Sequence, residues 1–361
     1  MEDTICRIVR AESLEPLFPM LEGFGKVWIV CDRNVWESVG EKILDGLSGT
    51  DAHGQRRLLG ASLIDATEEN KTLATMESIV EEMLANGADR NILVLGVGGG
   101  ITTDIAGFAA SVYKRGVRFA FVPTTLLAQV DAAIGGKNGV NFHSYKNMIG
   151  VIRQPEFTYI YNEPLKTLSR EAFLSGVSEL LKTFIIADAD AYSEALRRLR
   201  AWNGTCGEGK KTDYPEIGDL AAEAAGIKAG IVQQDPDEHG LRRVLNLGHT
   251  FAHAMEKLSG GKWPHGLAVS VGMVMAAALA EKMDGKATCS DGETFACEHG
   301  LAARLESDFR SIGLPTQCPY GIAEMAEAMS RDKKAEDGKV NFILPQRIGS
   351  VKTVKLSPYE L

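Results

Sequence analysis

The sequence predicts a two-domain α/β protein, with an N-terminal α/β domain over residues 1–160 and a mostly helical domain over residues 161–361. A length of 361 residues is enough for two domains with separate cores. In about the first 150 residues, short β-rich runs alternate with helical ones, the pattern of a parallel sheet with crossover helices. Beyond about residue 160, the strand-like runs give way to long helical periods.

Hydrophobic periodicity sets the elements of the first domain. Residues 91–97 form an apolar run typical of a buried strand, and Pro123 ends a second one. Apolar residues recur at helical spacing from Leu73 to Met83. We expect strands at 26–31, 58–64, 91–97 and 117–122, and helices at 71–85 and 105–113.

The second domain is expected to be built from helices. Helical periods cover 170–186, 188–201, 217–234, 247–258, 265–283, 293–312 and 321–331, and only residues 340–344 have the pattern of a strand. The longest apolar run, 267–280, is interrupted by Ser270 and Gly272. It is too short to cross a bilayer and predicts a buried helix.

Composition and charge exclude several classes of protein. A net charge of −9 argues against nucleic-acid and membrane-surface partners, so an anionic ligand would need a local cluster of lysine and arginine. The six cysteines are far apart and include no Cys-x-x-Cys, which favours reduced thiols. The acidic N-terminus lacks a secretory signal, so we expect a cytoplasmic protein.

Three of the seven histidines lie within seventeen residues, in Asn246-Leu-Gly-His-Thr-Phe-Ala-His253 and at His265. His249 and His253 are four residues apart, so both project from one helix face. Neutral imidazoles are common Zn²⁺ ligands. Two helix-surface histidines and one in a turn would give the same pattern.

A glycine-rich turn follows the predicted strand 91–97. Strand, glycines and helix are the layout of a phosphate-binding turn, because the backbone can approach the ligand and the helix N-terminus offers unpaired N–H groups. Ile101 stands where the dinucleotide fingerprint has its third glycine, and no Gly-Lys-Ser/Thr follows. A tight turn in which glycine only relieves a steric clash is the alternative.

Further polar residues follow in order. Thr124 and Thr125 come after a strand, where their hydroxyls can donate to a ribose or phosphate, and Lys137 follows a pair of glycines. Glu179 and Lys182 are three residues apart on one helix face. A surface ion pair is the commoner meaning of that spacing, but the apolar neighbours indicate burial, where charges need partners or a metal.

Taken together, these segments resemble 3-dehydroquinate synthases over about residues 65–350. The shared motifs are long and occur in order: GGGITTDIAGFAA, VPTTLLAQVDAAIGGKNGVN, YKNMIG, SGVSELLK, GLRRVLNLGHTFAHAME, HGLAV and DKKAEDGKVNFILP. The fold implied is a Rossmann-like nucleotide-binding domain followed by an all-α domain, related to the iron-type alcohol dehydrogenases.

The resemblance implies one bound NAD and one divalent metal, Zn²⁺ or Co²⁺. Its metal ligands would be Glu179, His249 and His265, one carboxylate and two imidazoles with open positions. His253 becomes a substrate-site residue, which replaces the pairing suggested by the spacing. The NAD contacts implied are Asp32, Asn34, Glu68, Lys71, Gly99, Gly100, Ile101, Thr102, Thr103, Asp104, Thr124, Thr125, Lys137 and Lys146.

The implied substrate is 3-deoxy-D-arabino-heptulosonate 7-phosphate. Hydride transfer to NAD⁺, β-elimination of phosphate, return of the hydride and an aldol closure would give 3-dehydroquinate. The substrate contacts implied are Asp131, Lys137, Asn147, Lys182, Lys228, Arg242, Asn246, His253 and one of Lys333 or Lys334. Asn246 and His253 would orient or shuttle protons. Arg115 resembles an arginine that reaches the neighbouring subunit's site, which implies a homodimer.

The chain departs from the family pattern at several positions. Thr103 replaces a glycine of the pyrophosphate turn, where a Cβ reduces backbone approach. Leu267 replaces a glutamate after His-Gly, which puts the tuning of the metal in doubt if that glutamate orients a ligand. The alternatives are a sister sugar-phosphate cyclase with another ring product, an NAD-dependent polyol dehydrogenase, and a non-catalytic metal- and nucleotide-binding protein.

Overall fold

The computed structural model describes residues 7–49, 54, 56–143, 145–203, 214–330 and 339–360. It divides the chain into two units. The first unit contains Met1–Leu168 and Ala221–Ala229, and the second contains Ser169–Leu220 and Gly230–Leu361. The helix α7 (Gly218–Gln234) therefore supplies residues to both units.

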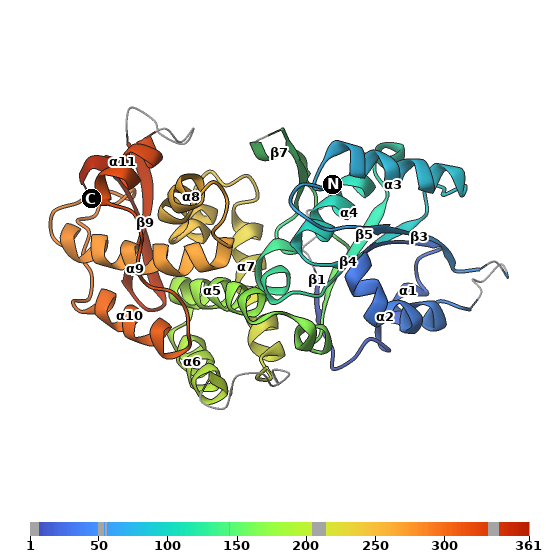
Figure 1. Cartoon of the computed structure of the whole chain (residues 1–361), viewed down its shortest axis with the longest axis horizontal. Helices are drawn as coiled ribbons and strands as arrows, with labels where there is room; N and C mark the ends of the chain where they lie inside the picture. Colours follow the sequence, from blue (N-terminus) through green and yellow to red (C-terminus); the bar gives the residue numbers. More distant parts are fainter. Residues whose placement is uncertain are drawn as a thin grey trace. The chain divides into compact units, whose positions relative to one another are not determined.

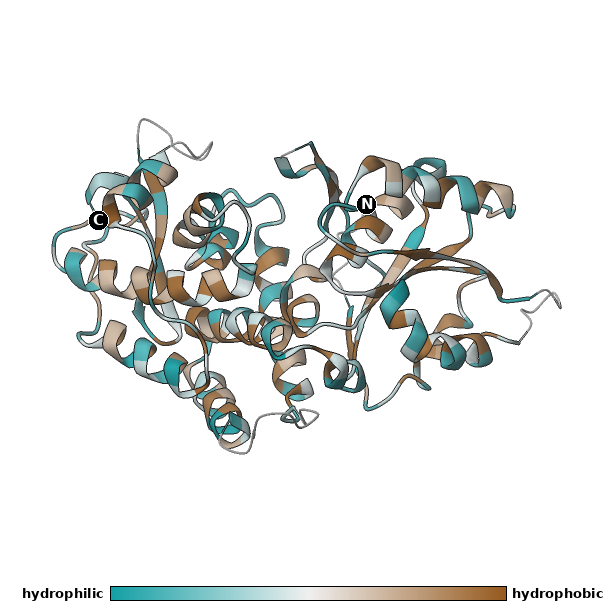
Figure 2. Ribbon diagram, in the orientation of Figure 1, coloured by the Kyte–Doolittle hydropathy of each residue, from teal (hydrophilic) through white to brown (hydrophobic). Residues whose placement is uncertain are grey.

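A six-stranded sheet forms the first unit, in the order β1-β8-β5-β4-β2-β3 with every pair parallel (Figure 1). These strands are β1 (Arg7–Arg10), β8 (Phe157–Ile160), β5 (Arg118–Pro123), β4 (Leu93–Gly98), β2 (Val27–Asp32) and β3 (Leu58–Ile64). Each residue of β4 is buried, as expected for a strand covered on both faces. Figure 2 shows hydrophobic colouring along the strands and on parts of the helices.

Helices cover both faces of this sheet. Val94 lies in a core cluster with residues of α3 (Leu73–Ala85) and α4 (Gly100–Val112). Its neighbours Leu93 and Leu95 lie in a second cluster with α1 (Leu17–Leu21) and α2 (Arg33–Gly46). This alternation is the period of two that side chains follow along a strand. The α/β prediction for this region is confirmed.

Several elements of this unit were not predicted: β1, β8, α1, α2, β6 (Lys137–Phe142) and β7 (Tyr145–Ile152). Helix α2 begins immediately after the predicted strand 26–31, and Asp32 caps it by accepting a hydrogen bond from the Asn34 N–H at 2.9 Å. The antiparallel hairpin of β6 and β7 follows a turn in which Gly135 and Gly136 have φ of 99° and 72°.

The second unit is mainly helical, as predicted. Its helices include α5 (Arg170–Ala187), α6 (Ala189–Asn203), α8 (His249–Leu258), α9 (His265–Met283), α10 (Leu301–Ser311) and α11 (Ile322–Ser330). Helix α9 is long and apolar enough to cross a membrane by length and composition (Figure 2). However, 67% of its apolar 18-residue stretch is buried inside the protein, as in a core helix.

One expectation for this unit was wrong, and a second was confirmed but incomplete. The helix expected over 293–312 begins only at Leu301, because Gly300 has a φ of +80° and residues before it form turns and an isolated bridge between Thr288 and Thr294. The predicted strand 340–344 is confirmed as part of β9 (Val340–Arg347), but its antiparallel partner β10 (Ser350–Leu356) was not predicted.

Candidate functional site

Three helices of the second unit bring one carboxylate and two imidazoles together. Glu179 of α5, His249 at the start of α8 and His265 at the start of α9 offer ligand atoms that all lie within 4.8 Å of one another. Glu179 Oε1 lies 3.8 Å from His249 Nε2 and 3.5 Å from His265 Nε2. Two nitrogens and one oxygen with open positions are a donor set typical of catalytic zinc.

Close backbone contacts hold these helices together. A Cβ on Gly266 would lie 2.1 Å from the Ser175 carbonyl oxygen, so glycine is what lets α9 approach α5 one turn before Glu179. A Cβ on Gly272 would likewise lie 2.1 Å from the carbonyl oxygen of Gly248, the residue that precedes His249. The ligand positions are therefore fixed by the backbone rather than by flexible side chains.

Glu179 is completely buried and its oxygens have room for another partner. Oε2 forms an ion pair with Lys182, which is 1% exposed, so the pair is buried rather than a surface pair. Neither Glu179 oxygen accepts a hydrogen bond of acceptable geometry from the residues that the structure describes. A buried carboxylate that faces two imidazoles, with no hydrogen bond of acceptable geometry from the described residues, fits a divalent cation.

Each histidine of the group has its other ring nitrogen beside an acceptor. His249 Nδ1 lies 3.1 Å from the carbonyl oxygen of Leu247, and His265 Nδ1 lies 2.7 Å from Glu256 Oε1. A carbonyl oxygen only accepts, so Nδ1 of His249 carries the proton and Nε2 keeps its lone pair. Burial, with the nearby Lys182 ammonium, holds the pKa of His249 well below its usual value, which favours the neutral, ligating ring.

His253 lies beside this group without belonging to it. Its ring centroid is 5.6 Å from that of His249 and 6.2 Å from that of His265. The pairing of His249 with His253 suggested by spacing alone is therefore not the geometry found, since the carboxylate and the third histidine complete the group of ligand atoms.

A 3-10 helix before α8, Leu241–Asn246, carries Arg242 and Asn246. Arg242 is buried, donates to the Pro236 carbonyl oxygen at 2.6 Å and has its backbone N–H bound to the Asp235 carboxylate at 2.9 Å. The Asn246 amide donates to Glu238 Oε1 at 2.7 Å. Glu238 was not predicted as a site residue, although it precedes the two predicted substrate residues Arg242 and Asn246 in the sequence.

The glycine-rich turn of the first unit has the expected shape. Helix α4 begins after Gly99, which has no side chain to cap the first N–H groups, and its first internal bond runs from the Thr103 N–H to the Gly99 carbonyl at 3.0 Å. Thr102 Oγ1 is buried without a partner among the described residues. A Cβ on Gly99 would lie 3.1 Å from Thr125 Cγ2 and one on Gly100 would lie 2.9 Å from the Ala132 Cβ, so this is a cradle that side chains would fill.

The threonines around this turn have defined positions. The Thr124 N–H donates to the Gly98 carbonyl at 2.9 Å, which ties the two strand ends together. Thr103 replaces a glycine of the family pattern, and its hydroxyl donates back to the Gly100 carbonyl at 3.0 Å inside the first turn of α4. The Thr103 hydroxyl is thus hydrogen-bonded to the backbone of its own helix.

A polar network gathers several predicted cofactor residues. The Lys71 ammonium, 5% exposed, contacts the Asp104 carboxylate and the Asn147 side-chain oxygen. Glu68 accepts from the Asn141 amide at 2.8 Å and lies 3.9 Å from the Lys146 ammonium. Burial raises the pKa of Asp104 to about 6, although Lys71 acts to lower it.

Two predicted substrate residues pair within the first unit. The Lys228 ammonium lies 2.7 Å from Asp131 Oδ1 and 2.8 Å from the Asp131 carbonyl oxygen. Asp131 is in a π-helical turn, Ala128–Ala132, a rare conformation that is frequent at functional sites. Lys137 is exposed at the start of β6.

Other predicted residues are not drawn into these groups. Asp32 is occupied as the cap of α2, where Asn34 is its partner. Arg115 is exposed at the end of a 3-10 turn with a φ of 69°. Lys333 and Lys334 lie outside the described residues.

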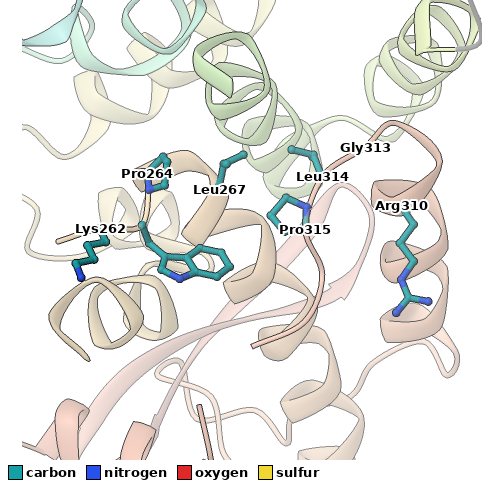
Figure 3. A pocket seen from close by; sticks show the side chains of 8 residues that line it. Lys262, Pro264, Leu267, Arg310, Gly313, Leu314 and Pro315 are labelled. Carbon is teal, nitrogen blue, oxygen red and sulfur yellow. The ribbon is translucent and has the colours of Figure 1, made fainter. Parts of the chain in front are cut away.

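Leu267 does not face the three ligand atoms. Its side chain lines a surface hollow together with Lys262, Trp263, Pro264, Arg310, Gly313, Leu314 and Pro315 (Figure 3). Residues two apart on a helix point in different directions, so a side chain at this position and His265 face different surroundings.

Comparison with known proteins places the chain in a family. The model described as 3-dehydroquinate synthase N-terminal matches residues 61–175, and the one described as 3-dehydroquinate synthase C-terminal matches residues 176–335. The chain belongs to the 3-dehydroquinate synthase family. A 3-dehydroquinate synthase of Pyrococcus abyssi is 44% identical over 294 residues, which cover 81% of this chain and 80% of that protein. One from Picosynechococcus is 37% identical and covers 95% of this chain and 90% of its own length.

Solved structures of related enzymes share the fold. The 2-epi-5-epi-valiolone synthase of Streptomyces hygroscopicus subsp. jinggangensis, solved with NAD⁺ and Zn²⁺ bound, is 26% identical with a TM-score of 0.83 and covers 100% of this chain and 95% of its own. A 2-deoxy-scyllo-inosose synthase complexed with carbaglucose-6-phosphate, NAD⁺ and Co²⁺ has 21% identity, a TM-score of 0.79 and coverage of 99% and 95%. The second likeness shows the fold alone.

Proposed function

We propose that this protein is a 3-dehydroquinate synthase that converts 3-deoxy-D-arabino-heptulosonate 7-phosphate to 3-dehydroquinate and phosphate, a carbon–oxygen lyase of aromatic amino-acid biosynthesis. The observation that carries the proposal is the group of Glu179, His249 and His265, in a chain that belongs to this family. NAD⁺ when bound would take up and return a hydride, and a divalent cation when bound would polarise the substrate hydroxyl.

The residues of the second unit supply ligands and charge. Glu179 Oε1, His249 Nε2 and His265 Nε2 would hold the cation. The buried ammonium of Lys182 and a divalent cation together outweigh the single negative charge of Glu179. A substrate with a carboxylate and a phosphate would offset this excess, which favours an anionic substrate over a neutral polyol.

The residues around the substrate would position it and move protons. Arg242 is a buried guanidinium, suited to bind a carboxylate or phosphate through two parallel N–H groups. His253 and Asn246 would orient the reacting hydroxyls or shuttle their protons. In the first unit, the residues proposed to contact a substrate are Asp131, Lys137, Asn147 and Lys228.

The NAD site would be formed by the glycine turn and the network beside it. The unpaired N–H groups at the start of α4 would bind the pyrophosphate. Thr124 and Thr125 would donate to it or to a ribose, and Lys71 would hold Asp104 in place. Asp32 and Asn34 would lie near the adenosine ribose.

The direct test measures phosphate release from the heptulosonate phosphate with added NAD⁺ and Zn²⁺, before and after EDTA treatment. We expect metal-dependent release, formation of 3-dehydroquinate and no net NADH. The variant Glu179→Gln should lose this activity, whereas Glu171→Gln, at an exposed position in the first turn of the same helix, should keep it.

The other outcomes separate the alternatives. Release of phosphate with a different carbocycle would identify a sister cyclase. Steady accumulation of NADH without phosphate would identify a polyol dehydrogenase. Binding of metal and NAD⁺ without turnover would identify a non-catalytic binding protein.

The proposal also includes assembly and location. A homodimer is proposed because Arg115, exposed at the end of its turn, matches the family's arginine that reaches a neighbouring site. Light scattering gives the mass directly, and Arg115→Ala should reduce phosphate release without changing metal content. We also propose a cytoplasmic location, as expected from the sequence.

A further inference from the structure

We propose that Glu256 is a positioning residue of the metal centre, whose carboxylate holds the His265 imidazole in the tautomer and orientation that turn Nε2 toward Glu179. The inference rests on the proposed metal site. The family pattern has a glutamate at position 267 that could orient a metal ligand. In this chain we assign that role to Glu256 of α8.

The geometry places Glu256 on the correct side of the ring. Its Oε1 lies 2.7 Å from His265 Nδ1, while His265 Nε2 lies 3.5 Å from Glu179 Oε1. The two ring nitrogens thus face two different carboxylates. With the proton on Nδ1, directed to Glu256, the lone pair of Nε2 points to the cation position.

Helix α8 contributes to both histidines. Glu256 is seven residues after His249, close to two full turns, so both side chains lie on the same face of α8. His249 is oriented by a carbonyl oxygen of its own backbone, whereas His265 depends on a side chain of another helix. The orientation of His265 can therefore be altered by a single substitution.

The main chain of Glu256 also anchors the segment that leads to His265. Its carbonyl oxygen accepts from the Ser259 hydroxyl at 2.9 Å and from the Gly261 N–H at 2.8 Å. Trp263 N–H in turn donates to the Ser259 hydroxyl at 3.4 Å. The backbone and the side chain of one residue thus act on the same ligand.

Burial makes the contact with Glu256 effective. The Glu256 side chain is 16% exposed, compared with 39% for His265. A charged acceptor shielded from water fixes the ring more firmly than an exposed one and increases the basicity of the ligating nitrogen. Removing such an acceptor typically weakens metal binding by about 10- to 100-fold.

Leu267 explains why this role falls to Glu256. Position 267 lines the hollow of Figure 3 and carries no acceptor. The carboxylates of Glu179 and Glu256 both lie within ion-pair distance of His265. Glu179 faces Nε2 and Glu256 faces Nδ1, so Glu256 is placed to orient the ring through Nδ1.

The test measures metal affinity directly. Apo protein is titrated with Co²⁺, followed by its visible absorption, and Zn²⁺ affinity is obtained by competition with a chelator. We expect Glu256→Ala to weaken the binding of both ions by about 10- to 100-fold. Glu256→Gln keeps the shape and an acceptor oxygen but loses the charge, so it should weaken their binding less. Glu171→Gln is the matched exposed control and should bind like the wild type.

A second measurement needs no metal. In apo protein labelled with ¹⁵N-histidine, the His265 ring should be the Nδ1–H tautomer in the wild type and shift toward Nε2–H in Glu256→Ala. Phosphate release by Glu256→Ala should recover at saturating Zn²⁺, as expected of a residue that acts through a ligand.

The outcomes are distinct. Failure of the wild type to bind either ion would overturn the proposed metal site. Wild-type binding together with unchanged affinity and unchanged tautomer in both Glu256 variants would overturn only the role of Glu256.

Discussion

The contact between α9 and α5 predicts that a single methyl group will disable the metal site. In Gly266→Ala, the new Cβ would lie 2.1 Å from the Ser175 carbonyl oxygen and 2.5 Å from its hydroxyl oxygen, whereas ordinary contact begins at 3.4 Å. The closest atom belongs to the backbone and cannot rotate away. The start of α9 must therefore move by about 1.3 Å, the difference between 3.4 and 2.1 Å.

That displacement is large compared with what a metal site tolerates. His265 is the residue immediately before Gly266, and metal–ligand distances hold to about 0.2 Å. We expect Zn²⁺ affinity to fall at least about 100-fold, more than for loss of an orienting partner, because a ligand itself is displaced. The free energy of unfolding should fall by about 1–3 kcal/mol from overpacking.

Chelator competition measures the affinity, and denaturant unfolding of the apo protein measures the stability. The matched control is Gly230→Ala, within helix α7, where a Cβ meets no heavy atom within 4 Å. It should leave Zn²⁺ affinity unchanged and raise stability by up to about 1 kcal/mol. Wild-type Zn²⁺ affinity in a folded Gly266→Ala protein would refute the claim that this contact sets the position of His265.

Three further predictions concern other parts of the molecule. Lys71→Met removes the ammonium shared by Asp104 and Asn147 and should weaken NAD⁺ binding at least about tenfold by calorimetry, whereas Lys42→Met, at a partly exposed surface ion pair, should not. Because burial raises the pKa of Asp104 to about 6, its contribution to stability is present below its ordinary value of 3.8 and lost as the pH rises through 6. Asp104→Asn should therefore flatten the dependence of the unfolding midpoint on pH across this window, and an unchanged slope would contradict the assignment. His253→Ala should lower kcat by about 10²- to 10⁴-fold with Zn²⁺ affinity nearly unchanged, and unchanged turnover would exclude a proton-transfer role.

Much of the fold could be predicted because its strands are buried on both faces. The run that forms β4 is continuously apolar, and such runs stand out in a sequence. The hairpin of β6 and β7 did not, since β7 is mostly exposed and lacks an apolar alternation. Helix α2 was not predicted, although the sequence offers an N-cap residue in Asp32 and two apolar residues four apart, Val39 and Ile43, which are both buried.

The site could be predicted only in part from spacing. The i, i+4 spacing of His249 and His253 indicates one helix face, yet the chain assembles Glu179 and His265 with His249 from three different helices. Contacts between helices that are distant in the sequence produce no periodic pattern. The set of three ligands was therefore predicted only from the resemblance to the family. Glu256 was within reach of local reasoning, because it lies on the face of α8 that carries His249.

The buried cations argue that these groups exist for ligands rather than for stability. In the part of the chain that the structure describes, the buried lysines and arginines are Lys71, Lys182, Lys228 and Arg242, between 1% and 8% exposed. All four were predicted as cofactor or substrate residues. Each has an acidic or carbonyl partner inside its own unit, so each is tolerated, but replacing a buried ion pair by apolar residues is often neutral or stabilising. In a protein with a net charge of −9, four buried cations that all lie at predicted ligand positions support the proposal of an anionic substrate and cofactor.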